Sequence, residues 1–411
     1  MNPVREVVRL RRARTQLPVQ TTGNPAVEIF LWSRAAIWSA AVLAASLLAP
    51  NPRAGTWDRP ALTHDLGLFT DVWARWDSVF FLRIAEHGYQ AGSDPAFFPL
   101  YPALVGIGGR ALGGHYVLAG VVVSLVACLG ALVLLYRLAE SRLGAEGGRR
   151  AVLYVALFPT ALFLQAVYSE SLFLLLAVAV FAFAERGRFL EASTAAGLAL
   201  LTRPAGLALL PPLLLLAARS DRRVRSLASL ALAPALFAAY PLVLWLETGR
   251  PWAFASAQGL WHRHLSAMGP LSGIWDGLRA GFAGIEQLVS GSHTHRYWKP
   301  VHDLDPMRVA VLNLEMLAFL MLFAVLAVVV WRRFGAPYGL FAVGSLALPL
   351  SVPSEHWPLL SIPRFGLVVF PFFLALAVLG RTARIHTAIV AVSSLLLGVA
   401  VTEWSLWYWV A

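Results

Sequence analysis

Charged residues and cysteine are scarce in this sequence of 411 residues. Asp, Glu, Lys and Arg account for 13% of the chain, hydrophobic residues for 58%, and the mean hydropathy is +0.67. A composition this apolar excludes an ordinary soluble domain. The single cysteine, Cys128, lies within an apolar run, which excludes a disulfide framework and a cysteine-based metal site. The glycine motif of P-loop proteins is also missing.

Hydrophobic runs are what the chain has in abundance. Several of them reach or approach the length of about 20 apolar residues that crosses a bilayer as an α-helix. The sequence therefore predicts an all-α polytopic integral membrane protein with about 11 transmembrane helices, built as one transmembrane domain over residues 1–411. The predicted spans lie near residues 29–49, 116–136, 151–166, 170–184, 192–205, 206–218, 227–246, 309–331, 337–351, 364–380 and 386–403.

Positive charge is unevenly distributed along the chain, whose formal net charge is +11. Arginines cluster in the basic N-terminal segment 1–28 and in alternate connections between the predicted spans. Short connections rich in Lys and Arg remain in the cytoplasm. We therefore expect a cytoplasmic N-terminus, with segments 50–115 and 247–308 on the outer face. The basic charge is explained by this topology, and no nucleic-acid partner is expected.

The two outer segments are too long to be simple connections, and long loops commonly carry function. Within the first of them, residues 69–86 have apolar side chains at helical spacing. This pattern predicts an amphipathic helix lying at the membrane interface. An interfacial helix does not explain Asp77, because a carboxylate close to the apolar phase needs either a cationic partner or a catalytic role.

A series of short motifs resembles one protein family. The motifs are Trp76-Asp77-Ser78 with Gly88-Tyr89, Phe97-Phe98-Pro99-Leu100-Tyr101-Pro102, Tyr168-Ser169-Glu170, Glu185-Arg186-Gly187-Arg188, Thr202-Arg203-Pro204-Ala205-Gly206-Leu207, and Pro251-Trp252-Ala253-Phe254 with Gln258 and Trp261. No single motif is decisive. In this order along residues 70–370, they resemble the PIG-V family of GPI mannosyltransferase 2-like enzymes and their bacterial relatives.

The resemblance implies a GT-C-type glycosyltransferase fold, with amphipathic helices in a large first outer loop. It implies transfer of mannose from polyprenyl-phosphate-mannose to a lipid-linked or glycan acceptor on the outer face, with an α-1,6 linkage and without a metal or other cofactor. Asp77 is then the expected catalytic base. It accepts the proton of an acceptor hydroxyl that attacks the anomeric carbon, and direct displacement inverts this centre.

Further charged and aromatic residues are candidates for substrate binding. Arg203 and Arg364 suit the donor phosphate, because guanidinium groups bind phosphate in a bidentate manner. Arg203 is alternatively an ion-pair partner of Glu170, and Arg364 an interfacial residue that snorkels. The remaining candidates are Arg75 and His87 on the donor side, and Glu170, Tyr168, Gln258, Trp261 and Arg263 on the acceptor side.

Four more of these candidates have structural alternatives. Arg75 could instead neutralise Asp77, and His87 could cap a turn at Gly88. Trp261 and Arg263 could contact lipid headgroups rather than an acceptor sugar. A histidine-rich group in the second outer segment suggests a metal site by composition only, because its spacing fits no standard pattern. A solvated loop is the alternative that we favour for this group, which comprises His293, His295, His302, Asp303 and Asp305.

A different functional class is a polytopic lipid or sugar transporter or flippase. Such a protein would place charged residues near the middle of several spans and often consists of two related halves. Here the intramembrane charges lie towards one face, and no related halves are visible. The chain contains 32 arginines but only one lysine, Lys299, which favours a bacterium of high genomic GC content and hence its plasma membrane. A eukaryotic member of the family would act in the endoplasmic reticulum. The acceptor and the oligomeric state are left open.

Overall fold

The computed structural model describes residues 23–52, 58–90, 92–301 and 304–410. In this part of the chain the regular structure is helical, apart from one isolated antiparallel bridge between Arg263 and Ser354. The predicted all-α class is therefore confirmed.

Five helices of the described residues are long and apolar enough to cross a membrane. They are α2 (Pro25–Leu47), α7 (Tyr116–Ala156), the segment formed by α11 (Arg223–Ser229), α12 (Leu232–Phe237) and α13 (Ala239–Thr248), then α16 (Pro306–Phe334) and α20 (Ala383–Ser405). The shorter apolar helices are α8 (Glu170–Ala184), α9 (Phe189–Leu200), η4 (Pro204–Leu209) with α10 (Leu210–Ala218), α17 (Ala336–Ser351) and α19 (Phe370–Leu379). The chain is thus an integral membrane protein with several candidate spans, and the larger number of spans remains a prediction.

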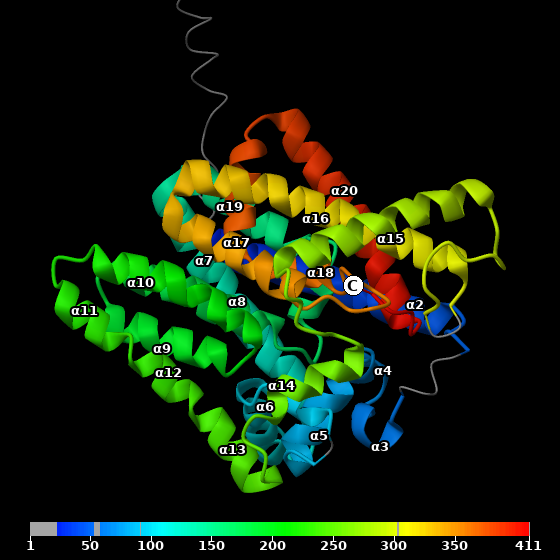
Figure 1. Cartoon of the computed structure of the whole chain (residues 1–411), viewed down its shortest axis with the longest axis horizontal. Helices are drawn as coiled ribbons and strands as arrows, with labels where there is room; N and C mark the ends of the chain where they lie inside the picture. The colour runs from blue at the N-terminus through cyan, green and yellow to red at the C-terminus, as the bar shows by residue number, and fades with distance from the viewer. Residues whose placement is uncertain (1–22, 53–57, 91, 302–303, 411) are drawn as a thin grey trace, which may run out of the picture.

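The remaining helices are short, with two exceptions, and most belong to the segments predicted to lie outside. They are α3 (Pro60–Thr63), α4 (Leu68–Asp71), α5 (Ser78–His87), η2 (Asp94–Ala96), α6 (Leu100–Ala111), η3 (Ala161–Leu164), α14 (Ala253–Ser256), η5 (Ala257–Trp261), α15 (Pro270–Ser290) and α18 (Ile362–Leu367). Figure 1 shows the apolar helices lying roughly side by side, with α3 to α6 gathered in one corner of the molecule.

Helix α7 is a hairpin of two helical arms. Gly144 has φ +76° and ψ 172°, a conformation that glycine adopts at little cost and other residues do not. A Cβ atom at Gly148 would lie 3.1 Å from the ring of Tyr136, whereas a straight helix would separate these positions by about 18 Å. The connection predicted at 137–150 is therefore helical on both sides of a turn at Gly144.

The second arm of α7 ends at Ala156, ten residues before the predicted end of that span at 166. Residues 157–169 are buried but irregular, and they include η3. A helix that stops inside the protein leaves carbonyl groups without partners. The buried side chain of Arg34 on α2 supplies donors, with Nη2 2.8 Å from the carbonyl oxygen of Ala156 and Nη1 2.8 Å from that of Ala161.

The prediction of one amphipathic helix over residues 69–86 is wrong. Helices α4 and α5 cover its two ends, and between them the chain leaves the helix, with Trp76 at φ +53°. Tertiary hydrogen bonds explain the break. The N–H of Val167 donates to the carbonyl of Trp73 at 3.0 Å, and the N–H of Asp77 donates to the hydroxyl of Tyr168 at 3.1 Å. Most of α5 is buried within the protein instead of lying on its surface.

The second outer segment contains a long helix that was not predicted. Helix α15 has 21 residues and lies alongside α16 (Figure 1). Its packed face consists of small residues, and a Cβ atom at Gly277 would lie 2.8 Å from the side chain of Leu359. Small residues of this kind allow close packing of helices. The opposite face is exposed and apolar, with Trp275 and Phe282 on it.

The segment between η5 and α15 is attached to the loop that follows α17. The N–H of Ser266 donates to the carbonyl of Ser351 at 3.0 Å, and the N–H of Glu355 donates to that of His262 at 3.0 Å. This pairing fixes the second outer segment next to α18, which carries Arg364.

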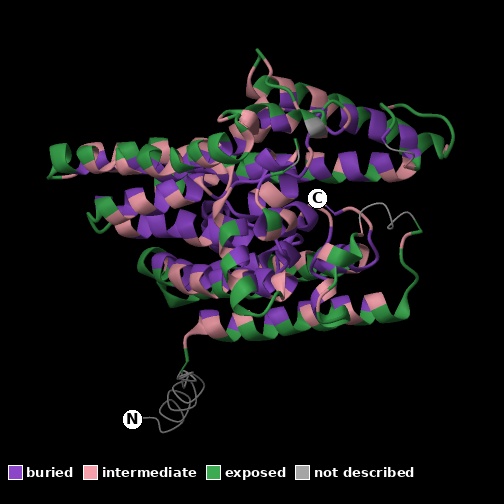
Figure 2. Ribbon diagram, turned by 90° about the horizontal axis from the view of Figure 1, so that it is seen from below, coloured by how far each residue is buried: buried purple, intermediate pink, exposed green. Residues whose placement is uncertain are grey.

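Burial increases towards the centre of the molecule, where the helices meet, and exposed residues lie on the outward faces (Figure 2). Helix α8 is buried along nearly its whole length. It begins with Glu170, whose side chain is only 2% exposed. A carboxylate buried to this extent requires charged or hydrogen-bonding partners.

Candidate active site

A cavity of about 420 Å³ lies between segments that are far apart in the sequence. Its walls come from the start of α5, the start of α8, the connection between α9 and η4, the region around η5, and α17 with α18. Most of the lining is apolar or aromatic, as in many pockets that bind small molecules. The charged residues of the lining are Asp77, Glu170, Arg203, Arg263 and Arg364.

The structure brings together all the candidate site residues except Arg75 and His87, because Tyr168, Gln258 and Trp261 also line the cavity. These residues are separated by more than 280 positions along the chain, from Asp77 to Arg364. Only the folding of the helices places them in one site.

The backbone around Asp77 is fixed from several sides. Asp77 directly precedes α5, and its N–H donates to the hydroxyl of the buried Tyr168. The indole N–H of Trp404 on α20 donates to the carbonyl of Val72 at 2.7 Å. The side chain of Asp77 is 23% exposed. The local break in the helix therefore presents a partly accessible carboxylate to the cavity.

Two arginines neutralise the two carboxylates of the cavity. Arg364 Nη1 lies 2.8 Å from Asp77 Oδ2, and Arg203 Nη1 lies 3.0 Å from Glu170 Oε1. Arg364 also approaches the second carboxylate, with Nε 3.5 Å from Glu170 Oε1. Each of the four side chains is less than a quarter exposed. The predicted pairing of Arg203 with Glu170 is confirmed, and the cationic partner of Asp77 is Arg364.

Aromatic rings surround the Arg364 guanidinium, whose central carbon lies 5.4 Å from the ring centres of both Phe163 and Tyr168 and 5.6 Å from that of Phe365. Cations are attracted to the faces of such rings. Arg364 is thus enclosed by protein, and a surface residue that snorkels into water would not be placed in this way.

Arg263 forms the third basic position of the cavity. It donates from Nη2 to the carbonyl of Leu360 at 2.9 Å and from Nη1 to that of Val352 at 3.3 Å. Burial, together with the positive charge of Arg364, lowers the pKa of Arg263 to about 10, and the Asp77 carboxylate acts in the opposite direction. Since this pKa is well above 7, the guanidinium remains charged at neutral pH. Trp261 lies on the same wall and packs edge-on against Phe97, with ring centres 5.6 Å apart.

Arg75 lies away from the cavity lining. It is buried, and its guanidinium carbon lies 4.2 Å from the centre of the Trp407 ring. Burial lowers the pKa of Arg75 to about 10, and the carboxylates of Asp58 and Asp71 act in the opposite direction. Arg75 therefore packs against the C-terminal tail and does not face the cavity.

His87 is also absent from the cavity lining. It is about half exposed at the end of α5, with Nε2 3.7 Å from Glu86 Oε2. The next residue, Gly88, has φ +76° and its N–H closes the last turn of the helix. This geometry agrees with the alternative in which His87 belongs to a helix-ending turn.

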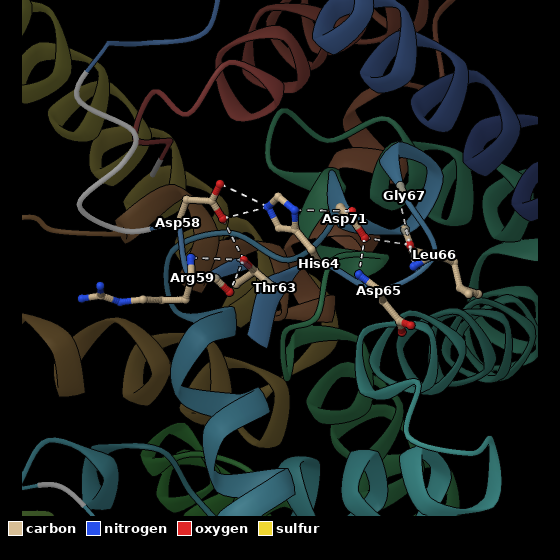
Figure 3. A network of polar contacts seen from close by, with 9 residues as sticks. Asp58, Arg59, Thr63, His64, Asp65, Leu66, Gly67 and Asp71 are labelled. Atoms are coloured by element: carbon tan, nitrogen blue, oxygen red, sulfur yellow. Dashed lines mark hydrogen bonds and ion pairs between the residues drawn. The ribbon is translucent and has the colours of Figure 1, made fainter. Parts of the chain in front are cut away.

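A polar network holds the loop in front of α4 (Figure 3). His64 Nε2 lies 3.0 Å from Asp58 Oδ1, and the hydroxyl of Thr63 donates to the same carboxylate at 2.8 Å. The N–H of Asp65 donates to Asp71 Oδ1 at 2.8 Å. The network therefore anchors the end of α4, from which the chain continues towards Asp77.

The C-terminal tail contributes residues that the sequence did not indicate. Trp409 and Val410 line the cavity, and the Trp409 ring lies 5.4 Å from that of Trp357. Asn51 donates to the carbonyl of Trp407 at 3.2 Å, which ties the tail to the end of the first helix. The density of tryptophan after the last predicted span was a signal that could have pointed to this wall.

The histidine-rich segment does not form a metal site among the described residues, where no group of three or more suitable ligands is found. His293 Nδ1 lies 2.7 Å from Asp305 Oδ2, and both side chains are exposed. His302 and Asp303 lie outside the described residues.

Comparisons with known proteins agree with this architecture. The structure is similar to that of ArnT from Cupriavidus metallidurans bound to undecaprenyl phosphate, with a TM-score of 0.51, 13% identity, and coverage of 92% of this chain and 64% of that chain. The oligosaccharyltransferase of Archaeoglobus fulgidus gives a TM-score of 0.40 at 13% identity, over 92% of this chain and 56% of that one. The chain is therefore an all-α membrane protein whose fold is similar to that of ArnT.

Sequence comparison gives matches to one protein family. Residues 30–213 match the mannosyltransferase (PIG-V) family. Over 125 residues the chain is 37% identical to the human GPI alpha-1,6-mannosyltransferase 2. The aligned residues make up 28% of this chain and 25% of the human protein. The match therefore spans about a quarter of that relative. Both matches agree with the family that the motifs resemble.

Proposed function

We propose that this protein transfers mannose from polyprenyl-phosphate-mannose to a hydroxyl group of a lipid-linked or glycan acceptor on the outer face of the membrane. The observation that carries the proposal is the position of Asp77. It presents a partly accessible carboxylate to the cavity, 2.8 Å from an arginine, within the part of the chain that matches the PIG-V family. A structurally similar protein is described as bound to undecaprenyl phosphate, which supports a lipid-linked donor.

The reaction that we propose is a direct displacement. Asp77 takes the proton of the acceptor hydroxyl, whose oxygen forms a new bond to the anomeric carbon. The bond from this carbon to the phosphate oxygen breaks, and the polyprenyl phosphate leaves with the electron pair. The anomeric centre is inverted, and the linkage proposed by family resemblance is α-1,6. General-base catalysis of this kind contributes about 10²–10⁴-fold to the rate.

The positions of the other residues suggest how the substrates are held. Arg203 and Arg364 face the cavity and offer positively charged N–H groups to the phosphate of the sugar donor. The departing phosphate needs fixed positive charge rather than a strong acid. Glu170, Tyr168, Gln258, Trp261 and Arg263 line the side proposed for the acceptor sugar. They offer carboxylate and amide oxygens as acceptors, aromatic surface, and the N–H donors of Arg263. We propose that the chemistry needs no metal or other cofactor.

The membrane arrangement belongs to the same proposal. About 11 spans, a single domain and a cytoplasmic N-terminus would place the cavity at the outer face, where lipid-linked donor and acceptor meet. Arginine-rich composition favours the plasma membrane of a bacterium as the location.

The experiment uses the full chain in nanodiscs with radiolabelled polyprenyl-phosphate-mannose, a lipid extract as acceptor source, and EDTA throughout. Wild-type protein should form a labelled glycolipid, and Asp77→Asn should lower the rate by at least about 10²-fold. Near-normal turnover by Asp77→Asn would exclude the proposed base. Failure of the wild type with every polyprenyl-phosphate sugar would instead favour a transporter or flippase.

A further inference from the structure

The arginine that neutralises Asp77 is the same one that faces the donor phosphate. Arg364 bonds to Asp77 through Nη1, while its Nε lies 3.5 Å from Glu170 without forming a hydrogen bond. Glu170 Oε2 is buried and also has no hydrogen-bond partner among the described residues. The bond to Asp77 therefore uses one edge of the guanidinium, and the approach to Glu170 uses another.

The charges of the cavity can be counted. Arg203, Arg263 and Arg364 face Asp77 and Glu170, so the charged lining residues carry one net positive charge when all are ionised. A sugar linked to a polyprenyl phosphate through a phosphodiester carries one negative charge. The donor would therefore neutralise the site as a whole.

The reaction changes both sides of this balance. The phosphodiester donor becomes a phosphate monoester, whose charge is about −1.5 to −2 at neutral pH. At the same time Asp77 gains the proton of the acceptor hydroxyl and becomes neutral, which raises the charge of the lining residues from one to two. The positive charge needed by the leaving phosphate therefore becomes available as the base takes up its proton.

We propose that Arg364 exchanges its ion pair from Asp77 to the leaving phosphate during the transfer. The proposal rests on the proposed function and adds a positioning role that depends on the state of Asp77. Before transfer, the bond from Arg364 Nη1 holds the Asp77 carboxylate in orientation. As Asp77 accepts the proton and the bond between the anomeric carbon and the phosphate oxygen breaks, Nη1 loses its anionic partner and turns its donor to the new phosphate charge. Glu170 holds the other edge of the guanidinium throughout.

Arginine is suited to such an exchange. Its guanidinium has five N–H donors in a rigid plane and stays charged in every step. The aromatic rings of Phe163, Tyr168 and Phe365 around Arg364 restrict its position without competing for its N–H donors.

The test measures binding of a product-like ligand and does not depend on turnover. Asn at position 77 mimics the protonated aspartic acid, which no longer competes for Arg364. Asp77→Asn should therefore bind undecaprenyl phosphate in nanodiscs about 10-fold more tightly than the wild type, the affinity equivalent of one recovered charge-assisted hydrogen bond. In the Arg364→Gln background, the same substitution at Asp77 should change the affinity by less than about 2-fold.

Glu355→Gln is the matched control. Glu355 is an exposed carboxylate in the loop before α18, paired with Lys299 at 3.3 Å and absent from the cavity lining. Its substitution removes the same charge near the site and should leave the affinity unchanged. Asp77→Ser provides a second neutral side chain should the asparagine variant not be recovered as a folded, monodisperse protein.

Unchanged or weaker binding by a folded Asp77 variant would overturn the exchange. Tighter binding that persists in the Arg364→Gln background, or that also occurs in Glu355→Gln, would overturn it equally, because it would reflect general charge. The proposed function is judged separately, by mannose transfer in the wild type and its loss in Asp77→Asn. An inactive Asp77→Asn variant with unaltered affinity would leave the transferase proposal standing and remove only the exchange.

Discussion

Breaking the ion pair between Arg203 and Glu170 is expected to destabilise the fold measurably. The N···O distance is 3.0 Å, and the two side chains are 12% and 2% exposed. Removing one partner of a buried ion pair typically costs about 3–5 kcal/mol, because the remaining charge is left without compensation. In this protein Arg364 lies 3.5 Å from the same oxygen of Glu170 and retains part of that compensation. We therefore expect Arg203→Gln to lower the free energy of unfolding by about 2–3 kcal/mol.

The pairwise part of this effect can be isolated with a double-mutant cycle. Glu170→Gln alone leaves Arg203 buried, and the double variant removes both charges together. The double variant should be more stable than the sum of the single effects predicts, by about 1–3 kcal/mol. Thermal unfolding of the purified protein in detergent, followed by tryptophan fluorescence, gives the order of the midpoint temperatures.

An exposed ion pair provides the control for this cycle. Arg188 and Glu191 pair at 2.8 Å, with side chains 53% and 41% exposed, and exposed pairs contribute about 0–1 kcal/mol. Arg188→Gln should leave the midpoint almost unchanged. If Arg203→Gln and Arg188→Gln behave alike, or if the cycle is strictly additive, the buried pair does not stabilise the site as argued.

Three further predictions concern positions outside the ion-pair cluster. Arg34→Met should lower the free energy of unfolding by about 2–4 kcal/mol, because two buried carbonyls lose their donors. The control is Arg279→Met, which replaces a side chain that is 60% exposed and should unfold at the wild-type midpoint. Gly144→Ala should lower the free energy of unfolding by about 1–2 kcal/mol, because alanine is strained at positive φ. Gly398→Ala, with open space around its Cβ position, should show no loss of stability. Equal unfolding midpoints for the two variants would refute the strained turn at Gly144. Trp409→Ala should raise the KM for donor or acceptor several-fold in the transfer assay while leaving the unfolding midpoint intact, and an unchanged KM would remove the tail from the substrate site.

The apolar helices and the break in the first outer segment show what hydrophobic patterns can and cannot predict. Hydrophobic runs located α8 and α17 within one residue, because a helix in an apolar surrounding is specified by its own composition. The same reasoning joined α4 and α5 into one helix. Helical spacing of Phe69, Trp76 and Phe80 carries no information on the hydrogen bonds that Val167 and Tyr168 make to this segment.

The candidate site shows a similar division. Motif resemblance selected Asp77, Glu170 and Arg203, and the charge cost of burial correctly suggested a pair between the last two. For Asp77, the sequence left open whether the residue is catalytic or is paired with a cation, and the cation that it suggested was Arg75. Arg364 lies far along the chain, and no local pattern relates it to Asp77.

By itself, the sequence determined the all-α membrane class, the location of most apolar helices, the family resemblance and the residue expected to act as base. Each of these depends on composition, local periodicity or short motifs, which are properties of neighbouring residues. Tertiary structure alone decided that α7 folds back at Gly144, that Arg34 completes the broken helix after Ala156, and that Arg364 joins Asp77 and Glu170. These contacts arise because buried charges and carbonyl groups must find partners, and in a folded chain the nearest partner in space is rarely the nearest in sequence.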